Sequence, residues 1–190
     1  YATNGLDQVC MTNALGVREW YRVYDANRRV TMAIDAMDRT NSYAYDAFGL
    51  PVAVTNNLGQ VTEYVRDASH QLQEVRVGTN ALSSYTYDAV GRVRTHTDVT
   101  GVTMTYDYDD LDRVTRISWP DGTCISNVWG CCKLERQIDR MRRVTDLGYT
   151  HVGNVSWVRD PLGRVTHYVY DADGEIAGLV NPSGNATHFE

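Results

Sequence analysis

The stretch Ser84–Asp98 reads SYTYDAVGRVRTHTD, and twenty-one residues further along the chain Thr105–Trp119 reads TYDYDDLDRVTRISW. Both segments carry Tyr-x-Tyr-Asp, and both continue after the same interval with Arg-Val. A pattern that returns at a fixed spacing is the signature of a repeat architecture, in which each copy is one supersecondary unit. The two segments therefore predict a fold built by duplication of a short unit.

The same unit can be followed through the whole chain. Aligned on the Asp of Tyr-Asp, nine copies appear, spaced by twenty-one residues except for one step of twenty between Gly130 and Thr150. The residue before this position is aromatic in seven of the nine copies, which chance does not produce. The repeat-defining residues, which we expect to be structural, are Tyr24, Asp25, Tyr45, Asp46, Tyr85, Tyr87, Asp88, Arg92, Tyr106, Tyr108, Asp109, Arg113, Tyr168, Tyr170 and Asp171.

A second group of turn signals lies about midway between these positions. It includes TNNLG (55–59), RDPLG (159–163) and VNPSG (180–184). Asn, Asp, Pro and Gly favour turns because Pro fixes φ, Gly permits positive φ, and Asn or Asp bonds the nearby backbone. The segments between turns alternate in polarity, and none has sustained helical periodicity. The sequence therefore predicts an all-β fold of antiparallel hairpins repeating every 21 residues or so.

One hairpin cannot bury an apolar face by itself. An isolated pair of strands is marginal in water, whereas stacked hairpins support one another. We therefore expect successive copies to pair edge to edge in one long sheet that coils as it twists. Since the chain begins and ends inside a repeat, we expect residues 1–190 to form a single array of about nine repeats within a longer polypeptide.

Composition and motifs argue against several classes of function. A net charge of −6 is unlike that of nucleic-acid binders, which are usually basic. No apolar run approaches the length of a membrane span. The sequence has no Gly-rich phosphate loop, no nucleophile elbow and no zinc-ligand spacing. We expect no catalytic residue, no metal, no cofactor, no nucleic-acid partner and no membrane insertion.

The cysteines interrupt the repeat. WGCCK (129–133) replaces a Tyr-Asp turn and accounts for the shortened step, and Cys124 precedes the vicinal pair Cys131 and Cys132. Because a bridge between adjacent cysteines is strained, a disulfide from Cys124 to one member of the pair, across the hairpin, is the easier arrangement. The alternatives are free packing cysteines, a metal site and a redox function.

Several turn carboxylates are followed four residues later by Arg. These pairs are Asp25/Arg29, Asp88/Arg92 and Asp109/Arg113. Acid–base catalysis is one interpretation, but catalytic groups need a unique environment, and a repeat supplies many equal ones. We therefore expect Asp to cap the turn and Arg to pair with it or with a neighbour.

With these motifs in view, the chain resembles the RHS-repeat, or YD-repeat, family. The matching segments are YAYDAFGLP (43–51), YTYDAVGRV (85–93), YDYDDLDRV (106–114) and YVYDADGEI (168–176). The resemblance implies a sheet that spirals into a hollow shell, as in bacterial RHS proteins, insecticidal toxin complexes and teneurins. It implies a secreted or cell-surface scaffold without enzymatic activity, with flanking repeats and an enclosed C-terminal toxin domain as partners.

Other functions remain open at this stage. The aromatic residues that recur at the same place in successive copies are compatible with an extracellular adhesion surface that binds cell-surface glycans. Unpaired strands at the two ends of the sheet are compatible with self-association into oligomers or filaments. Some members of the resembled family end their shell with an aspartyl autoprotease marked by two Asp-Pro-x-Gly motifs. Here DPLG (160–163) is followed by NPSG (181–184), and Asn181 cannot supply the second carboxylate.

Overall fold

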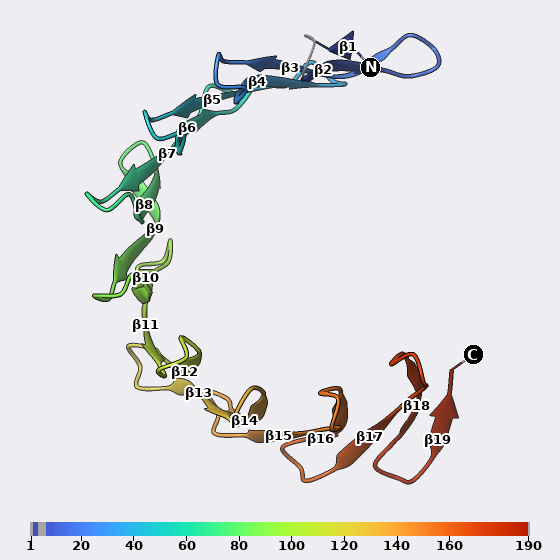
Figure 1. Ribbon diagram of the computed structural model, residues 1–190. Coiled ribbons are helices and arrows are strands. Elements are labelled where there is room, and N and C mark those ends of the chain that lie inside the picture. Colours follow the sequence, from blue (N-terminus) through green and yellow to red (C-terminus); the bar gives the residue numbers. More distant parts are fainter. Residues whose placement is uncertain (1, 4–6, 190) are drawn as a thin grey trace. The chain divides into compact units, whose positions relative to one another are not determined.

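The computed structural model describes residues 2–3 and 7–189, and Figure 1 shows strands joined by short loops, with no helix in that part of the chain. The strands are β1 (Ala2–Thr3), β2 (Gln8–Thr12), β3 (Arg18–Tyr24), β4 (Val30–Asp35), β5 (Thr40–Tyr45), β6 (Pro51–Thr55), β7 (Val61–Arg66), β8 (Leu72–Val77), β9 (Asn80–Tyr87), β10 (Val93–Thr97), β11 (Thr103–Tyr108), β12 (Val114–Ser118), β13 (Cys124–Trp129), β14 (Leu134–Ile138), β15 (Val144–Tyr149), β16 (Val155–Arg159), β17 (Val165–Tyr170), β18 (Ile176–Val180) and β19 (Ala186–His188).

These strands belong to two compact units. The first comprises Tyr1–Gly91 with His96–Gly101, and the second comprises Arg92–Thr95 with Val102–Glu190, so that the boundary falls within β10. In the first unit each strand from β1 to β9 pairs antiparallel with the next. In the second unit the strands from β11 to β19 do the same. The predicted all-β fold of antiparallel hairpin repeats is confirmed.

One type of loop closes most of the hairpins. In the loop 25–29, the N–H of Asp25 donates to the carbonyl of Arg29 (2.9 Å) and the N–H of Arg28 donates to the carbonyl of Asp25 (3.0 Å). Arg28 has a φ of 64°. This is a type I turn followed by a left-handed residue, a common hairpin closure that leaves a β-bulge. At the same place in the next repeat stands Gly49, with a φ of 86°, where glycine carries no steric penalty.

In each unit the same closure recurs at both ends of the strands. We call the end that carries the Tyr-Asp positions the anchor edge and the other end the opposite edge. We call the loops at the Tyr-Asp positions the anchor loops: 25–29, 46–50, 67–71, 88–92, 109–113, 130–133, 150–154 and 171–175. The turns predicted midway between them are the opposite loops: 13–17, 35–39, 56–60, 98–102, 119–123, 139–143, 160–164 and 181–185. Strands of five to seven residues between such loops set the repeat length.

Two loops depart from this pattern. In the anchor loop 130–133 the N–H of Gly130 donates to the carbonyl of Lys133, three residues later instead of four, so the one-residue shortening lies in this turn. Between β8 and β9, Val77 pairs directly with Asn80 around Gly78, whose φ is 58°. A positive φ at the first central residue is what a type II′ turn requires.

Neither unit contains a conventional core. Among the described residues no apolar side chain is fully buried, and the accessible surface is 12704 Å². A compact monomer of this mass would expose only about 9,100 Å². Because so little apolar surface is hidden, contacts between neighbouring strands and loops carry an unusually large share of the stabilisation.

Candidate functional site

The anchor loop at Asp25 shows the arrangement that recurs along the anchor edge. We use the word corner for such a loop together with its capping residue and the residue four positions later. Oδ1 of Asp25 accepts hydrogen bonds from the N–H groups of Asn27 (2.9 Å) and Arg29 (2.9 Å). Oδ2 accepts a hydrogen bond from Nε of Arg29 (2.7 Å). One carboxylate therefore caps the backbone of the turn and orients the arginine at its end, which is a charge-assisted arrangement.

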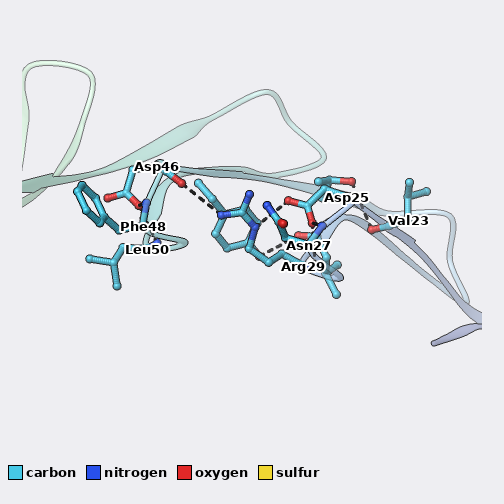
Figure 2. A network of polar contacts seen from close by, with 10 residues as sticks. Val23, Asp25, Asn27, Arg29, Asp46, Phe48 and Leu50 are labelled. Carbon is cyan, nitrogen blue, oxygen red and sulfur yellow. Dashed lines mark hydrogen bonds and ion pairs between the residues drawn. The ribbon is translucent and has the colours of Figure 1, made fainter. Parts of the chain in front are cut away.

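The arginine then reaches the next repeat. Nη1 of Arg29 donates to the carbonyl of Asp46 (3.2 Å), and its guanidinium lies 4.9 Å from the centre of the Tyr45 ring. Figure 2 shows the Arg29 side chain between the two loops, with dashed contacts toward Asp25 and Asp46. The contact combines cation–π attraction with a hydrogen bond and links one corner to the following corner.

Similar links recur along the anchor edge. Arg92 lies 4.7 Å from the Tyr108 ring and donates to the carbonyl of Asp109 (3.2 Å). Arg113 lies 5.3 Å from the Trp129 ring and donates to the carbonyl of Gly130 (3.0 Å). Where the arginine is replaced, the link weakens: Lys133 lies 5.7 Å from Tyr149, and Gln71 donates to the carbonyl of Gly91 (3.1 Å) without a cation.

Hydrogen bonds hold the pKa of Asp25 below its ordinary value. The N–H of Arg29 contributes most, partial desolvation opposes it, and the guanidinium of Arg29 and the N–H of Asn27 lower the pKa further. At Asp109 and Asp160 desolvation is the largest influence and raises the pKa, but the loop N–H groups and the following arginine together outweigh it. These aspartates are therefore ionised at neutral pH and suited to bind cations, not to donate protons.

The aromatic residue before each anchor position has a second role. Its polar tip donates a hydrogen bond to a backbone carbonyl of the preceding hairpin. The pairs are Tyr24–Gln8 (2.8 Å), Tyr45–Val30 (2.8 Å), Tyr87–Leu72 (2.7 Å), Tyr108–Val93 (2.8 Å), Trp129–Val114 (3.0 Å), Tyr149–Leu134 (2.7 Å) and Tyr170–Val155 (2.9 Å). Phe cannot make this bond, which accounts for the six tyrosines at this position among the thirteen of the chain.

Sequence reasoning identified this column but missed the hydrogen bond. The available signals were the excess of Tyr over Phe and the single replacement by Trp129, since Trp is the other large aromatic residue with a donor at its tip. The Tyr residues two positions earlier in the strands lie outside the corner contact. Tyr85 stacks on His96 with ring centres 4.7 Å apart, whereas Tyr168 borders a cavity described below.

The remaining predicted anchor residues show how the corner varies. Asp46 caps its loop through the N–H groups of Phe48 and Leu50, and Leu50 stands in the place of the arginine. Oδ1 of Asp88 accepts the N–H of Val90. Oδ1 of Asp171 accepts the N–H groups of Asp173 and Glu175, and here an acidic residue replaces the arginine.

The structure does not bring together the cysteines for which a disulfide within the shortened hairpin was predicted. Cys10, Cys124, Cys131 and Cys132 are all free thiols. Cys124 begins β13 and Trp129 ends it, so about 17 Å of extended chain separates Cys124 from the vicinal pair. A disulfide needs its two Cα atoms within about 7 Å. The prediction placed both ends of one strand at the same turn, whereas the extended β13 keeps them apart, so the bridge stays a prediction.

The two residues considered for autoproteolysis cap separate turns. Oδ1 of Asp160 accepts the N–H groups of Leu162 and Arg164, and Oδ2 accepts Nε of Arg164 (2.6 Å). Oδ1 of Asn181 accepts the N–H groups two and four residues later, each at 3.0 Å.

Within the described ranges, no three His, Cys, Asp or Glu side chains gather in a group that could hold a metal ion. The same part of the chain contains no helix with the length and apolar character of a membrane span.

Comparison with known proteins gives the context of these corners. The family model described as RHS Repeat matches residues 45–81, 87–123 and 149–186, which is more than half of the chain. No curated protein matches it. Among solved structures, the crystal structure of TcdB2-TccC3-Cdc42 has a TM-score of 0.60 at 14% sequence identity, over 91% of this chain and 12% of that chain.

Two further structures give the same values for all four measures. They are the crystal structure of TcdB2-TccC3 without hypervariable C-terminal region and a structure of the Photorhabdus luminescens Tc holotoxin pore. At such low identity the likeness concerns the fold, and this chain spans 12% of the length of the chains it matches. The 21-residue period, the capped anchor loops and the family match agree with one another. The chain belongs to the RHS-repeat family.

Proposed function

We propose that the chain is a non-enzymatic structural segment, a single array of repeats in the wall of an RHS-type β-shell. The observation that carries this proposal is the use of the repeated polar residues. Asp25, Arg29 and Tyr45 direct their polar atoms to the backbone or to one another. Asp109, Arg113 and Trp129 do the same in a later repeat. Side chains occupied in this way link repeats and are not available for chemistry on a substrate.

A second observation supports a larger parent polypeptide. Large apolar side chains stand at the tips of loops on both edges, mostly two residues after the capping position, and are 65% to 88% exposed. These loop-tip residues are Leu15, Met37, Phe48, Leu58, Val90, Leu111, Met141, Val152 and Leu162. Rows of exposed apolar side chains favour burial against another surface. In a spiralling sheet the neighbouring turns of the same polypeptide supply that surface.

The role of the shell follows from the resemblance. We propose that the parent polypeptide is secreted or displayed at the cell surface and that its shell encloses a toxin domain on the C-terminal side of this segment. Support comes from the family match and from the fold shared with toxin-complex components. Enclosure would keep a toxic domain away from the producing cell until delivery.

Protease protection tests the enclosure. The parent polypeptide and its excised C-terminal domain are incubated with a non-specific protease, and we expect the domain to survive only within the parent. Replacing Leu15, Leu58 and Leu162 with Glu opens the wall, so the domain becomes sensitive. Ser69→Glu and Ser183→Glu, at polar tips in the equivalent position, are the matched controls. A domain that is cleaved at once in the unaltered parent contradicts enclosure.

Intact mass tests the absence of self-cleavage. We expect the chain to keep its full mass after prolonged incubation between pH 4 and pH 8, because Asp160 and Asn181 each cap their own turn. A fragment ending near Asn181 would show that the segment has a proteolytic activity. The same fragment from an Asp160→Asn variant would instead point to a contaminating protease.

A further inference from the structure

Along the anchor edge, the step that leads to Tyr170 lacks a cation. In the step from loop 109–113 to Trp129, an arginine four residues after the cap lies over the next aromatic ring. In the step from loop 150–154 to Tyr170, the residue at that position is Asn154. That side chain carries no charge, and in the part of the chain that the structure describes no cation lies over the Tyr170 ring.

A cavity occupies the place of the missing side chain. It has a volume of about 710 Å³ and is lined by residues of both loops and of β17, including Asn154, Tyr168, Tyr170, Asp171 and Asp173. The volume is in the range of small-molecule sites. Asp171 and Asp173 are exposed, so the cavity can be reached from solvent.

The steps in which an arginine lies over the next aromatic ring show which chemical group fits the space between two anchor loops. The guanidinium groups lie 4.9 Å from the Tyr45 ring and 4.7 Å from the Tyr108 ring, and each donates at 3.2 Å to the carbonyl of the residue that follows that ring. Tyr170 and the carbonyl of Asp171 are the corresponding groups of the empty step. The Tyr170 hydroxyl still donates to the carbonyl of Val155 (2.9 Å), so the ring is held as in those steps.

The charge of the empty step also favours a cation. In the corner at Asp109, Oδ2 is paired with the loop's own arginine at 2.7 Å. In the corner at Asp171, the residue four positions later is Glu175, so the carboxylate has no basic partner within its loop. Asp173 adds a second negative charge to the cavity wall.

We propose that this cavity binds the guanidinium of an arginine side chain supplied by another polypeptide segment. The planar guanidinium stacks on Tyr170 and donates to the Asp171 carbonyl, as the chain's own arginines do toward the ring and the carbonyl of the next loop. The Asp171 and Asp173 carboxylates in the cavity wall supply the negative charge. Lysine fits less well, because its ammonium is a compact, strongly hydrated charge that neither stacks nor donates in two directions within one plane. The cavity is thus an acceptor site for an arginine-bearing partner, independent of any enclosed domain.

The test uses amide NMR spectra of the 190-residue chain titrated with N-acetyl-arginine methylamide, the corresponding lysine derivative and cellobiose. We expect saturable shifts of the Asn154, Asp171 and Gly174 amides with the arginine derivative alone, and a dissociation constant that rises with salt. Asp171→Asn weakens binding several-fold while keeping the turn, because an Asn caps the equivalent loop at Asn181. Asn154→Arg abolishes the shifts, because the chain then fills its own cavity.

The matched control is Asn185→Arg, which adds the same side chain four residues after a cap on the opposite edge. It should leave the titration unchanged. The proposal is overturned if the arginine derivative causes no saturable shift, if the lysine derivative binds equally well, or if Asn154→Arg still binds. Saturable shifts with cellobiose alone also overturn it and identify a sugar site.

Discussion

The guanidinium of Arg29 lies 4.9 Å from the ring centre of Tyr45, although the two residues belong to neighbouring repeats. The same Arg29 is paired with Asp25 of its own loop at 2.7 Å, and the Tyr45 hydroxyl donates to the backbone at Val30. One arginine thus joins the cap of one turn to the aromatic column of the next. In a sheet without a buried core, this contact takes over part of the role that a core has elsewhere.

Loss of this arginine should destabilise the first unit measurably. We expect Arg29→Ala to lower the free energy of unfolding by about 1–2 kcal/mol, because a partly desolvated cation–π contact and a hydrogen bond to the next repeat are removed. Urea denaturation followed by circular dichroism measures the change.

Arg39→Ala is the matched control for this experiment. Arg39 pairs with Asp35 in the same i, i+4 arrangement on the opposite edge, but it is 58% exposed and lies over no ring of the described residues. Its removal should cost less than half as much, since exposed ion pairs contribute little. Equal losses for the two variants would show that the inter-repeat contact has no special weight.

The tyrosine hydroxyl gives a second, smaller effect. Tyr45→Phe keeps the ring beneath Arg29 but removes the bond to the Val30 carbonyl, so we expect a loss of about 1 kcal/mol. Tyr43→Phe removes a hydroxyl in the same strand that has no protein partner among the described residues. If thermal or urea denaturation shows the two variants to be equally stable, the hydroxyl bond does not explain the preference for Tyr.

Acid should weaken the fold through the capping aspartates. The pKa values of Asp25 and Asp139 lie below the ordinary aspartate value of 3.8, chiefly because the N–H of the arginine four residues later donates to the carboxylate. A depressed pKa contributes stability that is present above the unfolded pKa and is lost as pH falls through the folded pKa. We therefore expect the urea midpoint of unfolding to fall progressively below about pH 4.

The substitution Asp25→Asn removes the negative charge of the capping side chain but keeps an oxygen that can cap the turn. Asn56 shows that an amide oxygen accepts the same two loop N–H groups, so the turn should persist while the titration of this site disappears. The pH dependence below pH 4 should therefore be shallower than in the unaltered chain. Asp110→Asn controls for the loss of one negative charge. An unchanged slope for Asp25→Asn would exclude this cap as a source of the acid sensitivity.

The vicinal cysteines should react as coupled free thiols. The neighbouring Cys132 raises the pKa of the Cys131 thiol, first by hydrogen bonding and then by its charge, so less thiolate is present at neutral pH. We expect Cys132→Ser to accelerate alkylation of Cys131 at pH 7.5, measured by peptide mass spectrometry. Thiol counting in denaturant should give four free thiols with or without reductant. A slower reaction in Cys132→Ser contradicts the coupling, and a Cys124 disulfide contradicts the extended β13.

Much of the fold could be predicted from the sequence because the information is local and repeated. In many loops, Asp or Asn at the cap, a glycine three residues later and β-branched residues around them specify the turn, and nine copies average out the degenerate ones. Asp67 illustrates this: Arg66 replaces the usual aromatic residue, yet the loop still closes through the same bonds to Ser69 and Gln71.

Contacts between repeats were harder to predict. Whether Arg29 pairs within its own loop or with the next repeat depends on how far a side chain reaches across two strands, which the spacing alone does not state. The expected cysteine bridge illustrates the same difficulty: Cys124 and Cys131 are close in the sequence, but the extended β13 holds them apart. The cavity beside Tyr170 became visible only because occupied corners show what is missing.

A cryo-electron microscopy structure of the parent polypeptide tests most directly whether this chain is part of the wall of a β-shell. The proposed shell predicts that residues 1–190 form part of a continuous β wall, with tip residues such as Leu15, Leu58, Met141 and Leu162 covered by neighbouring turns of the same sheet. It further predicts density for a C-terminal domain inside that wall. A structure in which these tips face solvent and the C-terminal domain lies outside the repeats would contradict the shell.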